Sequence, residues 1–91
     1  MPVGSRRIGQ VRFRAISGDH AEAKHPHLHA DIGSGELVIE FLEDGDVRLS
    51  TAHGDPIRGK VTVSEQRVVF RIARDNFDVL IALWKESQPD D

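Results

Sequence analysis

The sequence predicts a small α+β domain in which an antiparallel sheet of three to four strands packs against one or two C-terminal helices. Between residues 10 and 49, apolar and polar residues alternate in short runs separated by turns rich in glycine and aspartate. From residue 62 onward the apolar spacing changes to three and four residues, the period of an amphipathic helix. With 91 residues, we expect one domain over 1–91 whose ends, 1–9 and 88–91, are flexible.

The first two expected strands cover residues 10–16 and 27–32. Each strand alternates apolar and polar side chains, which predicts one buried face and one polar face. The apolar positions are Val11, Phe13, Ala15, Leu28, Ala30 and Ile32. The polar positions are Arg12, Arg14, His27, His29 and Asp31. Residues 19–26 between the strands are expected to form a loop, because Pro26 suits the start of a strand or a sheet edge.

The third expected strand, residues 36–42, follows a glycine turn at 33–35. A three-residue loop would pair Ile32 with Glu36 and set the histidines beside apolar residues, whereas a two-residue loop matches apolar with apolar. Because a slip of one residue turns a whole strand face over, we expect the two-residue loop. It is either Gly33-Ser34, a type II′ turn with glycine first, or Ser34-Gly35. In both cases Glu40 lies opposite one of the two histidines.

The remaining elements are a short fourth strand and two helices. The strand is expected at 47–49, after the turn sequence Glu-Asp-Gly-Asp. Residues 50–60 contain two glycines and a proline, so they are expected to form an irregular loop. The helices are expected at about 63–74 and 76–87.

The helix starts have capping residues at the expected spacing. Thr62 and Glu65 fit a capping box, and Asp75 is expected to cap the second helix. The rival interpretation makes residues 67–72 a strand, because RVVFRI is rich in β-branched and aromatic residues. The helix residues expected to cover the apolar sheet face are Val69, Ile72, Leu80 and Trp84.

The sequence HPHLHAD, residues 25–31, is the one stretch that indicates chemistry. On a strand, His27 and His29 leave the same face. Two histidines and one carboxylate are a donor set of catalytic zinc and non-haem iron sites. One hypothesis is therefore a site at His27, His29 and Glu40 for zinc or another divalent transition metal, in a metal-binding protein or metal-dependent hydrolase. The alternative is that both histidines are ordinary hairpin residues or partner contacts.

Positive charge gathers at one end of a chain whose net charge is −3. The first 16 residues contain no acid and four arginines, Arg6, Arg7, Arg12 and Arg14. These arginines predict contact with phosphate or an acidic partner, although the net charge argues against tight binding to nucleic acid. The alternative is a solvated strand face. Because so short a chain builds a small core, we expect a protein partner or a second copy, with contacts at Arg12, Arg14 and His25.

Other function classes have little support. Ser50, Thr51, His53 and Asp55 include the residue types of a catalytic triad, but triad members usually meet in space rather than in one loop. No apolar run approaches the ~18 residues of a membrane span. The chain has no cysteine, which fits a reducing compartment, so we expect a cytoplasmic protein that does not enter membranes.

The pattern resembles a small bacterial family of unknown function. The matching residues are Pro26, His27, Leu28, His29, Ala30, Gly33, Gly35, Leu80, Ile81 and Trp84, within residues 10–87. Members of that family carry a Pro-Pro-His-x-His strand and are often encoded beside a second small uncharacterised family; here His25 stands in place of the first proline. The resemblance implies a protein-partner role, as in a two-gene regulatory or toxin–antitoxin-like pair, with His27 and His29 as the positions of interest. Together with the small core and the absence of a full catalytic set, it predicts a non-enzymatic interaction module that is one component of such a pair.

Overall fold

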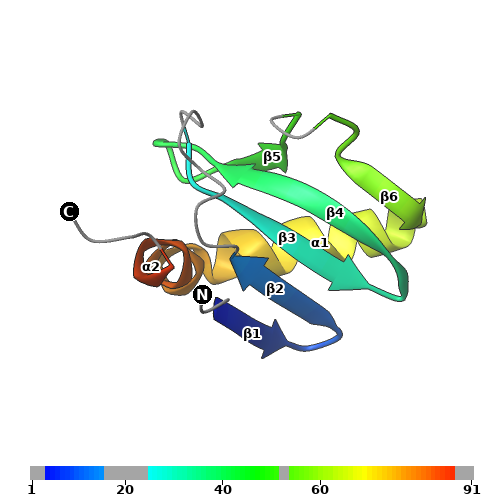
Figure 1. Ribbon diagram of the computed structural model, residues 1–91, viewed down its shortest axis with the longest axis horizontal. Coiled ribbons are helices and arrows are strands. Elements are labelled where there is room, and N and C mark those ends of the chain that lie inside the picture. The colour runs from blue at the N-terminus through cyan, green and yellow to red at the C-terminus, as the bar shows by residue number, and fades with distance from the viewer. Residues whose placement is uncertain (1–3, 16–24, 52–53, 88–91) are drawn as a thin grey trace.

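The computed structural model describes residues 4–15, 25–51 and 54–87. It confirms the small α+β fold, a sheet with antiparallel pairing followed by two C-terminal helices (Figure 1). The sheet has six strands rather than three to four. They are β1 (Gly4–Ile8), β2 (Val11–Ala15), β3 (His27–Ile32), β4 (Ser34–Phe41), β5 (Val47–Leu49) and β6 (Ile57–Lys60).

The first five strands are ordered along the sheet as in the sequence, and β6 also pairs with β4. One edge of β4 therefore holds two short strands end to end, with β6 along 34–37 and β5 along 39–41. Between them the Val38 amide donates to the Pro56 carbonyl, and the Val38 carbonyl accepts from the Ser50 amide, both at 2.8 Å. The backbone of β4 is thus paired continuously along this edge.

The hairpin of β3 and β4 has the expected two-residue loop. Ile32 lies opposite Gly35, so the loop is Gly33-Ser34. Gly33 has a φ of 58°, a conformation that suits glycine at the first position of a type II′ turn. In this register His27 lies opposite Glu40.

The two helices are α1 (Val63–Asp75) and α2 (Phe77–Glu86). The capping box is confirmed: the Glu65 amide donates to Thr62 Oγ1 at 3.0 Å, and the Thr62 amide donates to Glu65 Oε1 at 2.9 Å. The strand interpretation of residues 67–72 is wrong, because this segment is helical. The expected cap at Asp75 is also wrong: Asn76 holds that position, and its side chain donates to the Ile72 carbonyl instead.

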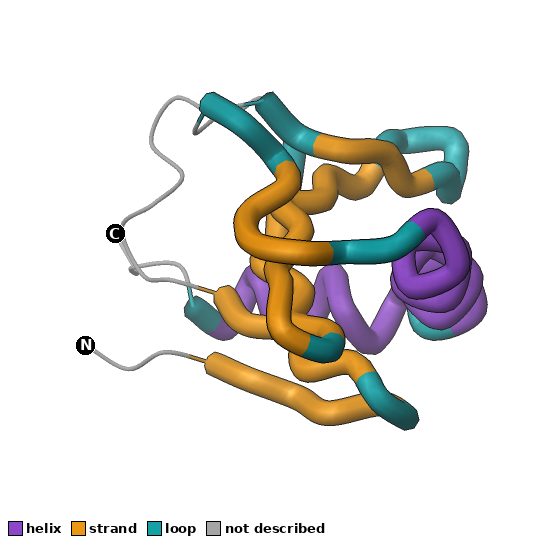
Figure 2. Tube along the Cα trace, turned by 90° about the vertical axis from the view of Figure 1, so that its right-hand side faces the viewer, coloured by secondary structure: helices purple, strands orange, loops and turns teal. Residues whose placement is uncertain are grey.

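The core lies between the apolar sheet face and the helices. In Figure 1, α1 crosses behind the strands and α2 is seen end-on beside β1 and β2; Figure 2 shows the same layers from the side. The buried apolar residues on the sheet face toward the helices are Val11, Phe13, Ala15, Leu28, Ala30, Ile32, Leu37, Ile39, Phe41 and Val47. Of the helix residues expected to cover them, Val69 and Leu80 are fully buried, and Ile72 and Trp84 are partly buried.

Two strands lie where no strand was expected. β1 occupies most of the segment 1–9 that was expected to be flexible, and β6 lies in the expected irregular loop 50–60. Both are edge strands with mostly exposed side chains, so they carry no apolar alternation, and β6 contains Gly59 at a φ of 74°. The expected flexible end at 88–91 and most of the expected loop at 19–26 lie outside the described residues. None of the described helices is long and apolar enough to cross a membrane.

Candidate functional site

The candidate site lies on the sheet face that points away from the helices, here called the polar face. Strands β2, β3 and β4 alternate, so the residues between the core positions of each strand share this face. It carries the candidate residues Arg12, Arg14, His27, His29 and Glu40, together with Asp31 and Glu36. His27 and His29 are 4% and 5% exposed, so both imidazoles are buried there.

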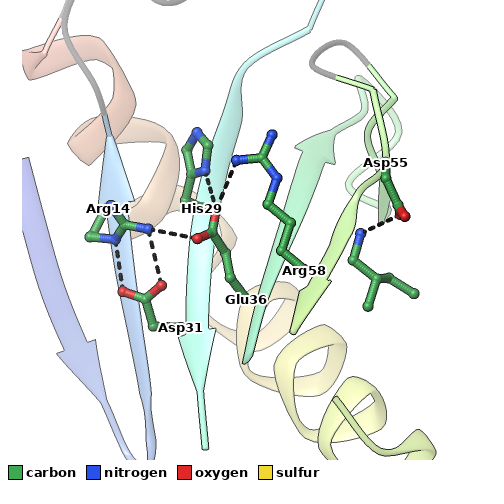
Figure 3. Close-up of polar contacts among 7 residues, drawn as sticks. Arg14, His29, Asp31, Glu36, Asp55 and Arg58 are labelled. Carbon is green, nitrogen blue, oxygen red and sulfur yellow. Dashed lines mark hydrogen bonds and ion pairs between the residues drawn. The ribbon is translucent and has the colours of Figure 1, made fainter. Parts of the chain in front are cut away.

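Four side chains on the polar face form an ion-pair network, defined as Arg14, Asp31, Glu36 and His29 (Figure 3). Arg14 Nε donates to Asp31 Oδ2 at 2.7 Å, and Arg14 Nη2 donates to Asp31 Oδ1 at 3.0 Å. Arg14 Nη2 also lies 3.2 Å from Glu36 Oε1. One guanidinium therefore bridges two carboxylates that lie directly opposite each other on β3 and β4.

Glu36 also contacts His29 on β3 and Arg58 on β6. Its Oε2 atom lies 2.7 Å from His29 Nδ1 and 3.8 Å from Arg58 Nη1 on β6 (Figure 3). Because an ionised carboxylate only accepts, the Nδ1 hydrogen of His29 is the donor in this contact. Glu36 thus holds side chains from β2, β3 and β6 together.

The charges of this region are balanced locally. Arg14 and Arg58 supply two positive charges, and Asp31 and Glu36 supply two negative charges. The hydrogen bonds from Arg14 to Asp31, helped by the negative charges of Asp31 and Glu36, raise the pKa of Arg14 above its ordinary value, although partial burial opposes the shift. The network therefore stabilises the charged form of Arg14, and together with Arg58 it leaves little net charge for a ligand.

The predicted metal ligands share the polar face but have different partners. His29 contacts Glu36, whereas the Glu40 carboxylate accepts a hydrogen bond from Arg48 Nε on β5. Among the residues in 4–15, 25–51 and 54–87, no group of three or more His, Asp or Glu side chains is arranged to hold a metal ion. The carboxylate that reaches His29 is Glu36, which was not a candidate. The two-residue loop indicates its position, because this register sets Glu36 opposite Asp31 on the histidine face.

The arginines of β1 and β2 form a second feature of the polar face. Arg7 and Arg12 are exposed and lie directly opposite each other. Arg12 is also opposite Asp31, but the carboxylate of Asp31 is bound by Arg14. Within the described part of the chain, no acidic side chain forms an ion pair with Arg7 or Arg12. We call these two residues the arginine pair.

The other candidate residues lie apart from the polar face network. His25 lines a cavity of about 430 Å³ beside α2, with apolar walls that include Pro26, Phe41 and Phe77. In the expected loop, Asp55 Oδ1 accepts the amide of Ile57 at 3.0 Å at the start of β6 (Figure 3). Residue 53, the histidine of the triad-like set, lies outside the described residues, so that set stays a prediction.

No family model, no curated protein and no solved structure matches this chain. The resemblance to the Pro-Pro-His-x-His family therefore stays a prediction, and its residues of interest, His27 and His29, are judged by their geometry.

Proposed function

We propose that this chain is a small non-enzymatic bacterial interaction module that binds a protein partner, as one component of a two-gene regulatory or toxin–antitoxin-like pair. The observation that carries the proposal is the arginine pair. Arg7 and Arg12 are exposed, lie side by side, and have no ion-pair partner among the described acidic side chains. A surface of this kind is complementary to a negatively charged protein.

The arginine pair has no evident benefit for folding. Like charges directly opposite on neighbouring strands destabilise a sheet, by an amount on the order of 0.2–1 kcal/mol. Asp31 faces Arg12 and would offset this repulsion, but it is bound by Arg14 with two hydrogen bonds. The repulsion is relieved when a partner brings carboxylates to the pair, and this favours a binding role.

The ion-pair network supports the same proposal, because it forms a rigid base beside the arginine pair. Arg14, Asp31 and Glu36 connect three neighbouring strands beside the arginine pair and keep the Asp31 carboxylate away from Arg12. We therefore assign the partner contact to Arg7 and Arg12, and a positioning role to Arg14. His27 and His29 are buried, so neither is assigned to the contact surface.

The test is affinity purification of the tagged protein from its source organism, with the charge-reversed variant Arg7→Glu/Arg12→Glu beside the wild type. The matched control is Arg67→Glu/Arg71→Glu, which changes the net charge equally at two exposed positions of α1. We expect one stoichiometric protein partner with the wild type and the control, and its loss from the variant. A wild-type protein that purifies as a monomer without a partner overturns the proposal.

A further inference from the structure

We infer that the outer edge of β1 is the docking edge for an extended acidic segment of the protein partner, which adds to the sheet as a further strand and sets carboxylates beside Arg7 and Arg12. This inference rests on the proposed function, because it names the chemistry of the partner.

The outer edge of β1 is open within the described structure. β1 is the first strand in the sheet order, and no described strand pairs with its outer side; Figures 1 and 2 both show it at the margin of the sheet. Its inner side pairs with β2 over all five residues. A strand with one paired and one open side is the template that strand addition uses.

The backbone groups that face outward follow from the register. Ile8 and Val11 flank the two-residue turn, so they exchange both hydrogen bonds, and Arg6 and Phe13 do the same two residues on. The amide and carbonyl groups of Ser5 and Arg7 therefore point away from β2. A docked strand would form its hydrogen bonds with these two residues.

The edge is held in place before a partner binds. α2 packs closely against the start of β1, since a Cβ atom on Gly4 would lie only 2.9 Å from Leu83 Cδ1. At the other end, the half-buried Ile8 packs against the core. A pre-ordered edge lowers the entropy cost of binding, because only the incoming segment has to become ordered.

The two sides of the edge predict an alternating sequence for the partner strand. On the polar face, Ser5 and Arg7 neighbour Arg14 and Arg12, so the partner residues there should be acidic. On the helix side, Arg6 lines a cavity of about 220 Å³ together with Val79, Leu83 and Glu86. Glu86 already offers a negative charge there, and Val79 is 41% exposed, so apolar residues fit this side. Acidic and apolar residues should therefore alternate along the partner segment.

A second copy of this chain is a poor occupant. Pairing two β1 edges would bring Arg7 and Arg12 of both copies onto one continuous face without a carboxylate between them. Nucleic acid would use the arginines but not the outward backbone groups of Ser5 and Arg7. Strand addition depends on free peptide amides and the binding of nucleic acid does not, so blocking the amides distinguishes the two.

The test is fluorescence anisotropy with the full chain and a labelled peptide of about eight residues that alternates Glu and Val, used at a concentration where the peptide is monomeric. Three comparisons accompany it: a peptide of the same composition with all Glu first, the alternating peptide with N-methyl groups on its Glu amides, which face Ser5 and Arg7 in an antiparallel pair, and a single-stranded oligonucleotide. The protein variants are Arg7→Glu/Arg12→Glu and its control Arg67→Glu/Arg71→Glu.

We expect the alternating peptide to bind the wild type and the control alike, and the arginine-pair variant at least about ten-fold more weakly. N-methylation of the peptide, and the peptide order with all Glu first, should each weaken binding to the wild type by a similar factor. Equal binding of the N-methylated peptide, or tighter binding of the oligonucleotide, overturns the inference. If the native partner is still lost from the arginine-pair variant in that case, the proposed function stands without the strand-addition mode.

Discussion

Arg14 binds both oxygens of Asp31, although the residue directly opposite Asp31 on β2 is Arg12. Arg14 lies opposite His29, and its side chain extends diagonally across the sheet to Asp31 and Glu36. This diagonal pairing of Arg14 has two consequences. It neutralises two carboxylates that face each other on adjacent strands, and it leaves Arg12 exposed beside Arg7.

Replacing Arg14 should destabilise the fold more than replacing Arg12. In Arg14→Ala, Asp31 and Glu36 face each other without their shared cation, and we expect a loss of about 1–2 kcal/mol in the free energy of unfolding, since the network is only part-buried. In Arg12→Ala, we expect a change within about 0.5 kcal/mol. Urea denaturation of both variants measures the difference. Equal losses would contradict the assignment of Arg14 to the structural network.

Zinc should not stabilise the wild-type protein. His29 contacts Glu36 and Glu40 is bound to Arg48, and among the described residues no group of three His, Asp or Glu side chains is arranged to hold a metal ion. A site that bound zinc would raise the free energy of unfolding by about 2.7 kcal/mol at a free zinc concentration of 100 Kd. Thermal unfolding with and without zinc tests this expectation. A rise in Tm that disappears in His27→Ala/His29→Ala would restore the metal hypothesis.

The Asp46–Arg74 ion pair, which joins the turn before β5 to α1, makes a pH-dependent contribution to stability. Arg74 Nε donates to Asp46 Oδ1 at 2.8 Å, and this hydrogen bond, with one from the Val47 amide, lowers the pKa of Asp46. A lowered carboxyl pKa stabilises the fold fully above the unfolded value, and the contribution is lost as the pH falls through the folded value. The pH range in which the contribution of Asp46 is lost therefore lies below about pH 4.

The measurement for Asp46 is an NMR titration of its carboxyl group in the wild type and in Arg74→Ala. We expect the pKa to rise toward its ordinary value in the variant. Asp46→Asn should flatten the acid dependence of stability in that pH range. An unchanged pKa in Arg74→Ala would show that Arg74 does not hold this carboxylate in solution.

The start of α1 should be sensitive to its cap. Thr62→Ala removes the hydroxyl that accepts the Glu65 amide and should cost about 1 kcal/mol of stability. Ser64→Ala, at an exposed position two residues further on, is the control, with an expected change within about 0.5 kcal/mol. Chemical denaturation compares them. A cost for Ser64→Ala as large as that for Thr62→Ala would indicate that the capping box contributes little.

The elements with strong hydrophobic periodicity were predictable. The β3–β4 hairpin and its two-residue loop follow from matched apolar faces and the glycine turn, whereas the choice between the two possible registers does not; α1 follows from its cap and its apolar spacing. β1 and β6 were not predictable in the same way. They are held by backbone pairing at the sheet edges, and backbone pairing leaves no side-chain pattern in the sequence.

The sequence was sufficient to predict which residues of the candidate site share one sheet face, but not which of these residues contact each other. Strand alternation is sufficient to place His27 and His29 together with a nearby glutamate. The two glutamates differ in their partners: Glu40 is bound by Arg48 on β5, whereas Glu36 contacts Arg14 through Oε1 and His29 through Oε2. None of these contacts can be inferred from local spacing, because each joins side chains of different strands, although all of these strands were expected.

The most direct test of the arginine-pair surface is amide hydrogen exchange, measured by NMR, at Ser5 and Arg7 in the full chain with and without saturating alternating Glu–Val peptide. We expect exchange at these two outward amides to slow by at least about ten-fold on binding, since each would then be hydrogen-bonded in a strand pair. Unchanged exchange at Ser5 and Arg7 while the peptide is bound would contradict docking at the β1 edge.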